Sequence, residues 1–245
     1  SFLIPVGTSM VRKELQPNFA IGILVGVVTV PAGLIAGGIA AGYPPAMIFH
    51  NTLPILILSL LIALGLWKAQ HFCILLFELL GRFMVVVATA GFAIGIIQEL
   101  TPLVILPGLG SVLDGIRVVG SVAIVLCGAY PMMFLINTIW HGPIHRLGRW
   151  MGIDQNAISC IFGGMANIMP ILGQCNQMSP AGVTAAMAFA LSCSCIFGDH
   201  LGFIASVDKE MIVPMLLSKA VGGIIALAAA VILCKRNQYS DQVLI

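Results

Sequence analysis

The chain has 245 residues, of which 60% are hydrophobic and 8% are charged, and its formal net charge is +2. Soluble domains carry about 25% charged residues, so this composition excludes a soluble globular protein and indicates a polytopic membrane protein. The small net charge argues against nucleic acid as a partner. Long apolar segments without an intervening linker predict an all-α fold in a single transmembrane domain over residues 1–245.

A transmembrane helix needs about 20 mainly apolar residues, and several segments meet this requirement. The uninterrupted ones are Asn18–Ala41, Met47–Leu66, Phe72–Ile97, Val118–Trp140 and Met211–Cys234. Two further apolar segments are irregular. Ala157–Leu172 is short and contains an asparagine and a proline, whereas Pro180–Val207 is too long for one straight span.

The basic residues test how often the chain crosses the membrane, because cytoplasmic loops are enriched in lysine and arginine. The basic groups lie at 12–13, at 68, at 145–149 and at 235–236. All of them fall on one side if Ala157–Leu172 enters and leaves through the same surface. We therefore predict about six transmembrane helices plus one re-entrant or broken segment. A break in Pro180–Val207 would give the same sidedness, so the sequence leaves open which segment is re-entrant.

Broken helices at membrane depth are tolerated where protein or a water-filled cavity surrounds them, and in transporters they often build the substrate site. The stretch FGDHLGF places Asp199 in such a segment, and an isolated charge there costs at least about 3 kcal/mol. Asp199 and Lys219 each lie about 9 residues from the loop at 208–210, hence about 13 Å below the same surface on two helical arms. Two interpretations stay open, a structural Asp199–Lys219 ion pair and a functional Asp199 with Lys219 as its ion-pair or gating partner.

Three uncharged or weakly basic residues complete the predicted substrate-binding set. His200 follows Asp199, and we expect it to make an orienting hydrogen bond, with a proton relay as the weaker alternative. Asn167 precedes Pro170, which cannot donate a helical hydrogen bond, so its amide is either a ligand group or a contact between helices. Tyr130, in the string GAYPM, offers a hydroxyl or a ring face to a cation, or is a packed, hydrogen-bonded core residue.

Nothing in the sequence predicts an enzyme, a metal site or a cofactor. An intramembrane aspartyl protease needs two aspartates that share a proton, and only Asp199 lies deep in a span. A zinc hydrolase needs clustered ligands such as HExxH, which do not occur. Cys193 and Cys195 would point to nearly opposite sides of a helix, so we interpret them as small core residues. His141 and His145 are predicted to be interfacial.

Several strings carry a family resemblance. They are GAYPM at Gly128–Met132, GDHLGF at Gly198–Phe203, SKAVGG at Ser218–Gly223 and IGILVGVVTVPAG at Ile21–Gly33. With them the chain resembles the ethanolamine permease of bacterial ethanolamine-utilization systems (the EutH-like family) along nearly its whole length. One departure concerns Asn167, because the family commonly has a second asparagine where this chain has Ile168. If that second amide contacts substrate, affinity or substrate choice differs here.

The resemblance implies a multi-pass permease that moves ethanolamine across the bacterial inner membrane for catabolism. Members are longer, with further spans ahead of this segment, so we expect the chain to be the C-terminal portion of a longer transporter, with those N-terminal spans as its partner in the bilayer. From the chemistry of this substrate we expect Asp199 to balance the ammonium charge, and Asn167, His200 or an unwound backbone carbonyl to bind the hydroxyl. The alternatives are a passive channel for a small amine or ammonia, and a non-transporting membrane protein. Formation of a homo-oligomer and the energy coupling stay open.

Overall fold

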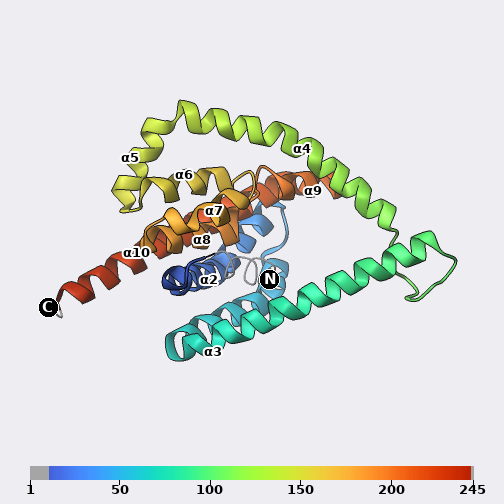
Figure 1. Ribbon diagram of the computed structural model, residues 1–245, viewed down its shortest axis with the longest axis horizontal. Coiled ribbons are helices and arrows are strands. Elements are labelled where there is room, and N and C mark those ends of the chain that lie inside the picture. The colour runs from blue at the N-terminus through green and yellow to red at the C-terminus, as the bar shows by residue number, and fades with distance from the viewer. Residues whose placement is uncertain (1–10, 244–245) are drawn as a thin grey trace.

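The computed structural model describes residues 11–243, except for the side chains of some residues within 66–81 and 121–137 and of residues 237–243. Every regular element in this part of the chain is helical (Figure 1), which confirms the predicted all-α class. The long helices are α2 (Gln16–Ala40), α3 (Pro45–Leu100), α4 (Val112–Ile139) and α10 (Ile212–Val243). The shorter ones are η1 (Lys13–Leu15), α5 (His141–Met151), α6 (Gln155–Gly164), α7 (Met169–Gln174), η2 (Cys175–Gln177), α8 (Pro180–Cys193), α9 (Asp199–Val207) and η3 (Lys209–Met211).

Length and composition allow four of the described helical segments to cross a membrane. They are Lys13–Ala40, Pro45–Gly65, Arg82–Leu100 and Lys209–Arg236. Helix α3 contains two of them, because its backbone leaves the helical region at Ala69 (φ −149°, ψ 52°) and the chain reverses direction there (Figure 1). The gap predicted between the span that ends at Leu66 and the span that begins at Phe72 is therefore a tight turn, with helix on both sides of it.

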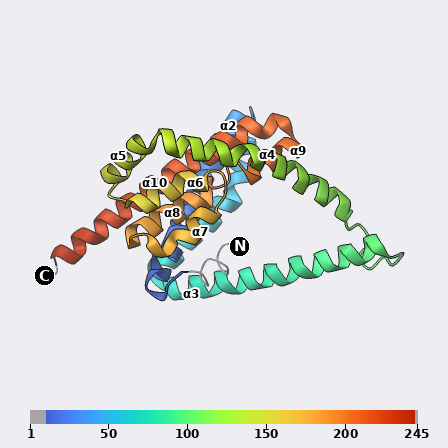
Figure 2. The same ribbon diagram turned by 45° about the horizontal axis from the view of Figure 1, so that its top comes forward.

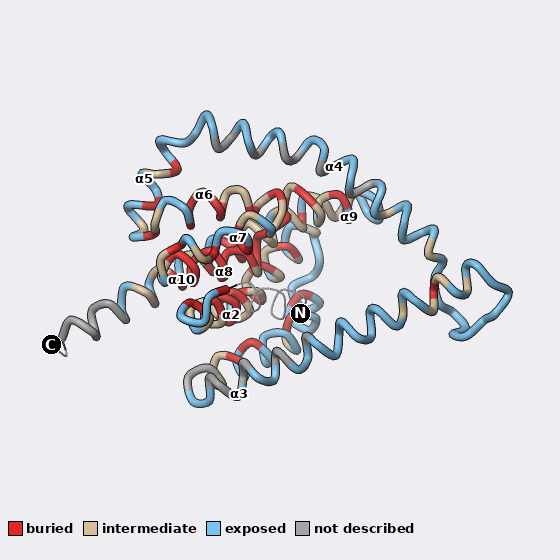
Figure 3. Tube along the Cα trace, viewed as in Figure 1, coloured by how far each residue is buried: buried red, intermediate tan, exposed pale blue. Residues whose placement is uncertain are grey.

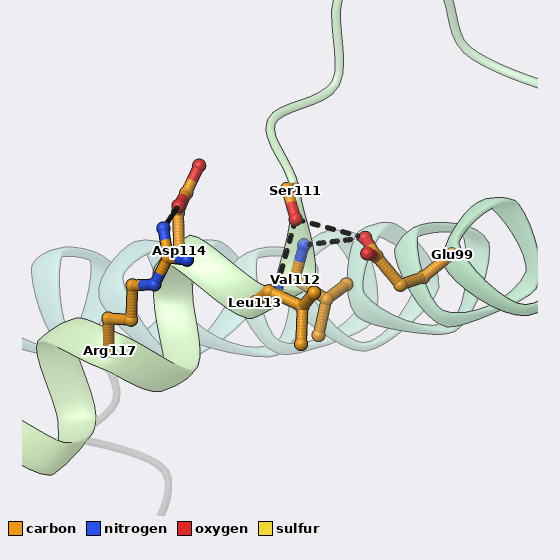
Figure 4. Close-up of polar contacts among 6 residues, drawn as sticks. All are labelled: Glu99, Ser111, Val112, Leu113, Asp114 and Arg117. Carbon is orange, nitrogen blue, oxygen red and sulfur yellow. Dashed lines mark hydrogen bonds and ion pairs between the residues drawn. The ribbon is translucent and has the colours of Figure 1, made fainter.

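The second half of α3 lies away from the other helices, whereas α4 packs on α9 (Asp199–Val207); both α4 and this half of α3 are largely exposed (Figure 3). The loop between them is held by side chains of the last turn of α3. Gln98 Oε1 accepts hydrogen bonds from the backbone N–H groups of Ile105 (3.2 Å) and Leu106 (2.7 Å). Glu99 Oε2 accepts from Ser111 Oγ (3.1 Å) and from the N–H of Val112 (3.2 Å), so this carboxylate caps the start of α4 (Figure 4).

The buried core is built by α2, α8 and α10, which pack on one another (Figures 1 and 3). Glycines on α2 allow this approach, as is common between membrane helices. A Cβ atom at Gly22 would lie 2.6 Å from the carbonyl oxygen of Thr184 on α8, and one at Gly33 would lie 2.5 Å from that of Ser218 on α10. Helix α2 therefore fixes the positions of α8 and α10 relative to each other.

Helices α6 and α7 form a hairpin that returns to the end of the molecule where it began. Asn156 Nδ2, at the start of α6, donates to the carbonyl of Gln177 (3.1 Å), just past α7. Asp154 Oδ2 accepts from both the N–H (2.9 Å) and the hydroxyl (2.6 Å) of Ser179, which is the N-cap of α8. Residues 155–174 thus enter and leave through one end, which is the arrangement predicted for the segment Ala157–Leu172.

The basic groups also gather at this end, which we call the basic end (residues 12–13, 68, 145–149 and 235–236). The N–H of Arg12 donates to Asn176 Oδ1 (2.8 Å), directly after α7. Lys235 on α10 and Gly152 after α5 line the same small cavity. The turn of α3 that follows Lys68 lies beside the beginning of α2 in both views (Figures 1 and 2). The fold therefore gathers these basic groups at one end of the helix bundle, and the side of the membrane that this end faces stays a prediction.

Candidate functional site

Two interrupted helices meet in the middle of the molecule. Helix α6 ends at Gly164 and α7 starts at Met169, while α8 ends at Cys193 and α9 starts at Asp199. We call the two unwound segments, residues 165–168 and 194–198, the helix-break crossing. The sequence predicted that both irregular segments are interrupted and left open which of them is re-entrant; the structure interrupts both.

The two breaks satisfy part of each other's backbone hydrogen-bonding capacity. The N–H of Cys195 donates to the carbonyl of Gly164 (2.9 Å), and the N–H of Phe197 donates to the carbonyl of Met165 (2.9 Å). Unpaired backbone groups cost several kcal/mol in hydrocarbon, so neither break would be stable without the other. The crossing is therefore one structural unit made from two distant parts of the sequence.

Different local features interrupt the two helices. Pro170 lies in the first turn of α7 and has no N–H to donate. In the other break, Cys195 has φ of 59°, and it is the only non-glycine residue with positive φ in the described part of the chain. The left-handed region costs an L-residue roughly 1–2 kcal/mol, so contacts around Cys195 must impose this conformation.

The crossing brings two of the predicted site residues into direct contact. Asn167 Nδ2 donates to Asp199 Oδ2 at 3.1 Å, and Asn167 Oδ1 accepts from the N–H of Met169 at 2.9 Å. Asp199 is the first residue of α9, where the helix dipole favours a negative charge. Both side chains are only partly buried. A carboxylate thus lies at the break with one oxygen fixed by an amide and with access from outside the core.

His200 is held by the backbone of the second break. The ring Nδ1 of His200 lies 3.1 Å from the carbonyl oxygen of Ser194, and the backbone N–H of His200 donates to the carbonyl of Cys195 at 3.2 Å. A carbonyl only accepts, so Nδ1 carries the proton, and in the neutral ring Nε2 is an acceptor. The sequence predicted an orienting hydrogen bond for His200. It gave no signal for Ser194 as the partner, because any residue supplies a carbonyl.

Lys219 reaches toward the same region from α10. It interacts electrostatically with Cys193, Cys195 and His200, and the packing of Gly33 against Ser218 holds this part of α10 in place. Among the described residues, no ion pair within 4.0 Å joins Lys219 to Asp199. The ion pair that the described residues do form joins Asp114 and Arg117 on α4 (2.8 Å; Figure 4). The two side chains of Lys219 and Asp199 are thus not in direct contact in this structure, and a role of Lys219 as ion-pair or gating partner stays a prediction.

The fourth predicted site residue, Tyr130, lies on α4, which packs on α9. Its side chain lies outside the described residues, so a cation contact of Tyr130 stays a prediction. Among the side chains that the structure describes, no group of three or more His, Cys, Asp or Glu is suited to hold a metal ion.

Fold and site together define a polytopic helical membrane protein with a polar site at the crossing of two discontinuous helices, an arrangement typical of transporters. The sequence profile of the family described as "Ethanolamine utilisation protein, EutH" matches residues 1–233. The chain belongs to this family.

Three relatives illustrate the similarity. "Probable ethanolamine permease EutH" of Listeria monocytogenes is 38% identical over 245 residues, which cover 98% of this chain and 66% of the relative. "Uncharacterized protein YxeR" of Bacillus subtilis is 39% identical over 229 residues (94% and 62%). "Probable ethanolamine permease EutH" of Salmonella typhimurium is 33% identical over 259 residues (96% and 64%). The chain thus spans 62% to 66% of these relatives' lengths. No solved structure matches it.

Proposed function

We propose that the protein serves the transport of ethanolamine across the bacterial inner membrane and that the helix-break crossing binds its ammonium group. The observation that carries this proposal is the hydrogen bond of 3.1 Å between Asn167 and Asp199, which joins the two breaks at a carboxylate. Two relatives named as probable ethanolamine permeases support the choice of substrate.

The groups at the crossing match the chemistry of the substrate. Ethanolamine near neutral pH is a small ammonium ion with a hydroxyl group, and a carboxylate can accept about four hydrogen bonds. Asn167 uses one of these on Asp199, so acceptor sites remain for the ammonium N–H groups. The Nε2 lone pair of His200 can accept from the substrate hydroxyl. Tyr130 would add an aromatic face if its ring turns toward the crossing.

The absence of a lysine in contact with the carboxylate matters for this mechanism. If Lys219 neutralised Asp199 directly, a substrate cation would have to displace it. In the structure the Asn167 amide and the Cys195 thiol hydrogen-bond to Asp199, and these uncharged partners leave the negative charge of the carboxylate intact. We propose that Lys219 acts as a gating partner, which approaches Asp199 after the substrate leaves and so keeps the empty carrier close to neutral.

Uptake of labelled ethanolamine by cells that produce the full-length protein tests the role of Asp199. Removing one partner of a partly buried charge pair costs about 2–5 kcal/mol, so Asp199→Asn is expected to lower uptake about thirtyfold or more. Asp208→Asn is the matched control, because Asp208 is an exposed aspartate in the loop after α9. Normal uptake by well-expressed Asp199→Asn would remove Asp199 from the site.

A second set of variants separates transport from a purely structural ion pair. We expect Asp199→Asn and Lys219→Met each to reach the membrane in normal amounts, because no direct contact between the two side chains is lost. If each single variant failed to accumulate and the double variant restored the protein, the pair would be structural and the proposed role of Asp199 would fail.

A further inference from the structure

A cavity with several polar lining residues lies between α5 and the α6–α7 hairpin, outside the crossing itself. Its volume is about 240 Å³, and the residues that line it include His141, His145, Ser159, Gly163, Pro170 and Gln174. None of the described residues that line it is acidic. It is therefore a site that offers neutral hydrogen-bonding groups without a fixed negative charge.

The wall of the cavity continues into the helix-break crossing. Gly163 lines the cavity, and its carbonyl accepts from the N–H groups of Ala166 (3.1 Å) and Asn167 (3.4 Å). Asn167 in turn donates to Asp199. On the other side, α5 carries Arg146 and belongs to the basic end. The cavity thus lies between the crossing and the surface predicted to face the cytoplasm.

The chemical groups that distinguish the cavity are two imidazole rings on one face of α5. The Nε2 atoms of His141 and His145 are 2.6 Å apart, and the ring centroids are 3.9 Å apart. Two N–H groups cannot point at each other at this separation, so at least one Nε2 presents a lone pair. Nδ1 of His145 is buried without a hydrogen-bond partner.

Orphaned buried N–H groups are rarer than under-satisfied acceptors, which favours the tautomer in which His145 donates from Nε2 to His141. The lone pair that receives this bond is on His141, whose side chain is exposed. An incoming ammonium group can donate to the same lone pair and displace the hydrogen bond between the rings. The pair therefore provides an acceptor for a primary ammonium ion, with Gln174 on the opposite wall for a hydroxyl group.

We propose that this cavity is a release site for small ammonium alcohols, which they occupy after leaving Asp199 and before they reach the basic end. The proposal rests on the function proposed above. Because no acidic residue lines the cavity among those described, a cation there is held only by neutral acceptors. It therefore binds weakly and leaves readily, as a release site requires. The nearby arginines of α5 favour its departure.

The test compares equilibrium binding with transport in the full-length protein. His141→Gln removes the imidazole acceptor, and His145→Gln removes the ring that donates to it. His50→Gln is the control, because His50 is exposed on α3. We expect both variants to bind labelled ethanolamine with unchanged affinity. We expect their maximal uptake rate to fall about fivefold, which corresponds to the loss of a hydrogen bond worth about 1 kcal/mol. Asp199→Asn should instead lose binding and uptake together, so the two proposals fail separately.

Two results would overturn the release site. One is a wild-type uptake rate in both histidine variants; the other is a loss of ethanolamine binding by folded histidine variants, which would make the pair part of the primary site. Size-exclusion profiles that match the wild type establish that the variants are folded.

A thiol at Ser159 gives an independent measurement that does not depend on the histidines. Ser159→Cys places the thiol on the cavity wall. The reagent 2-(trimethylammonium)ethyl methanethiosulfonate, added to inside-out vesicles, should modify this variant faster than the parent protein. Ethanolamine should slow the reaction severalfold. Modification no faster than in the parent, or unaffected by ethanolamine, would contradict the proposal.

Discussion

At the residue scale, Asp199 is the group on which the proposed chemistry depends. A lone carboxylate at membrane depth costs at least about 3 kcal/mol, and the structure offsets this cost with the amide of Asn167 and the N-terminal end of α9. Neither contact carries a positive charge. The residual negative potential is what a protonated amine would recognise.

Cys195 provides a test of the second break. In the left-handed region a glycine is free of the roughly 1–2 kcal/mol that an L-residue loses there. We therefore expect Cys195→Gly to keep or raise the thermal stability of the detergent-purified protein, and Cys195→Val to lower it. Cys193→Gly is the control, because Cys193 is buried at the last residue of helix α8 and its φ is not positive, so glycine relieves no backbone strain there. A more stable Cys195→Val would show that the break does not require this backbone conformation.

The sequence singled out the polar residues of the candidate site but not the partners that the structure gives them. Asn167 and Asp199 could be selected because polar groups within apolar segments are costly in a membrane and are therefore candidates for a function. Their direct hydrogen bond depends on how two segments separated by 32 residues cross. Lys219 was placed correctly on the helix opposite Asp199, yet depth alone could not predict which neighbours its amine meets. Likewise, His141 and His145 were predicted to be interfacial, and the structure adds that their rings line a cavity.

At the element scale, Asp154 ties the start of the hairpin to the start of α8. Its Oδ1 accepts from the N–H of Ala157 (2.9 Å) in the first turn of α6, and its Oδ2 accepts from Ser179. Gly182 must be a glycine here, because an added Cβ would collide with the carboxylate. One side chain therefore holds together the basic-end entrances of both broken helices.

Replacement of Asp154 should weaken both helices at once. A lost N-cap costs about 1 kcal/mol, and the charge-assisted bonds to Ser179 add to this, so Asp154→Ala is expected to reduce stability by about 2–3 kcal/mol. Asp208→Ala removes an exposed cap of the short η3, and we expect it to cost less than about 1 kcal/mol. Chemical unfolding in detergent micelles measures both. Equal losses for the two variants would contradict the bridging role of Asp154.

The irregularity of the two segments was predictable from Asn167, Pro170 and the glycines around Asp199, and so was the return of the first segment to the basic end. What the sequence could not show is that the breaks pair with each other through the backbone. The N–H of Cys195 and the carbonyl of Gly164 carry no side-chain signal. The cap by Asp154 was also missed, since an aspartate before a helix does not reveal a second helix that shares it.

At the scale of the whole molecule, α2 determines the spacing of the helices around the crossing. Gly33→Ala places a Cβ 2.5 Å from a backbone carbonyl of α10, which cannot move like a flexible side chain. We expect the protein to be destabilised by about 1–3 kcal/mol and α10 to shift relative to α8. Gly91→Ala on α3 is the control, because the described structure has no atom within 4 Å of its added Cβ.

The surroundings of the whole molecule explain why two helices carry so much exposed apolar surface. The second half of α3 and α4 present residues such as Phe83, Phe92 and Phe134 to the outside, each at least 60% exposed. Water would not support such a surface, whereas lipid or another membrane-embedded segment would. The chain spans 62% to 66% of its relatives' lengths.

Direct binding of labelled ethanolamine to the purified full-length protein tests the central claim, that the carboxylate of Asp199 holds the ammonium group. We predict saturable binding by the wild type, partial retention in Asp199→Glu and an affinity about thirtyfold lower or worse in Asp199→Asn, as expected for the loss of 2 kcal/mol or more. Binding by folded Asp199→Asn with the affinity of the wild type would contradict the account.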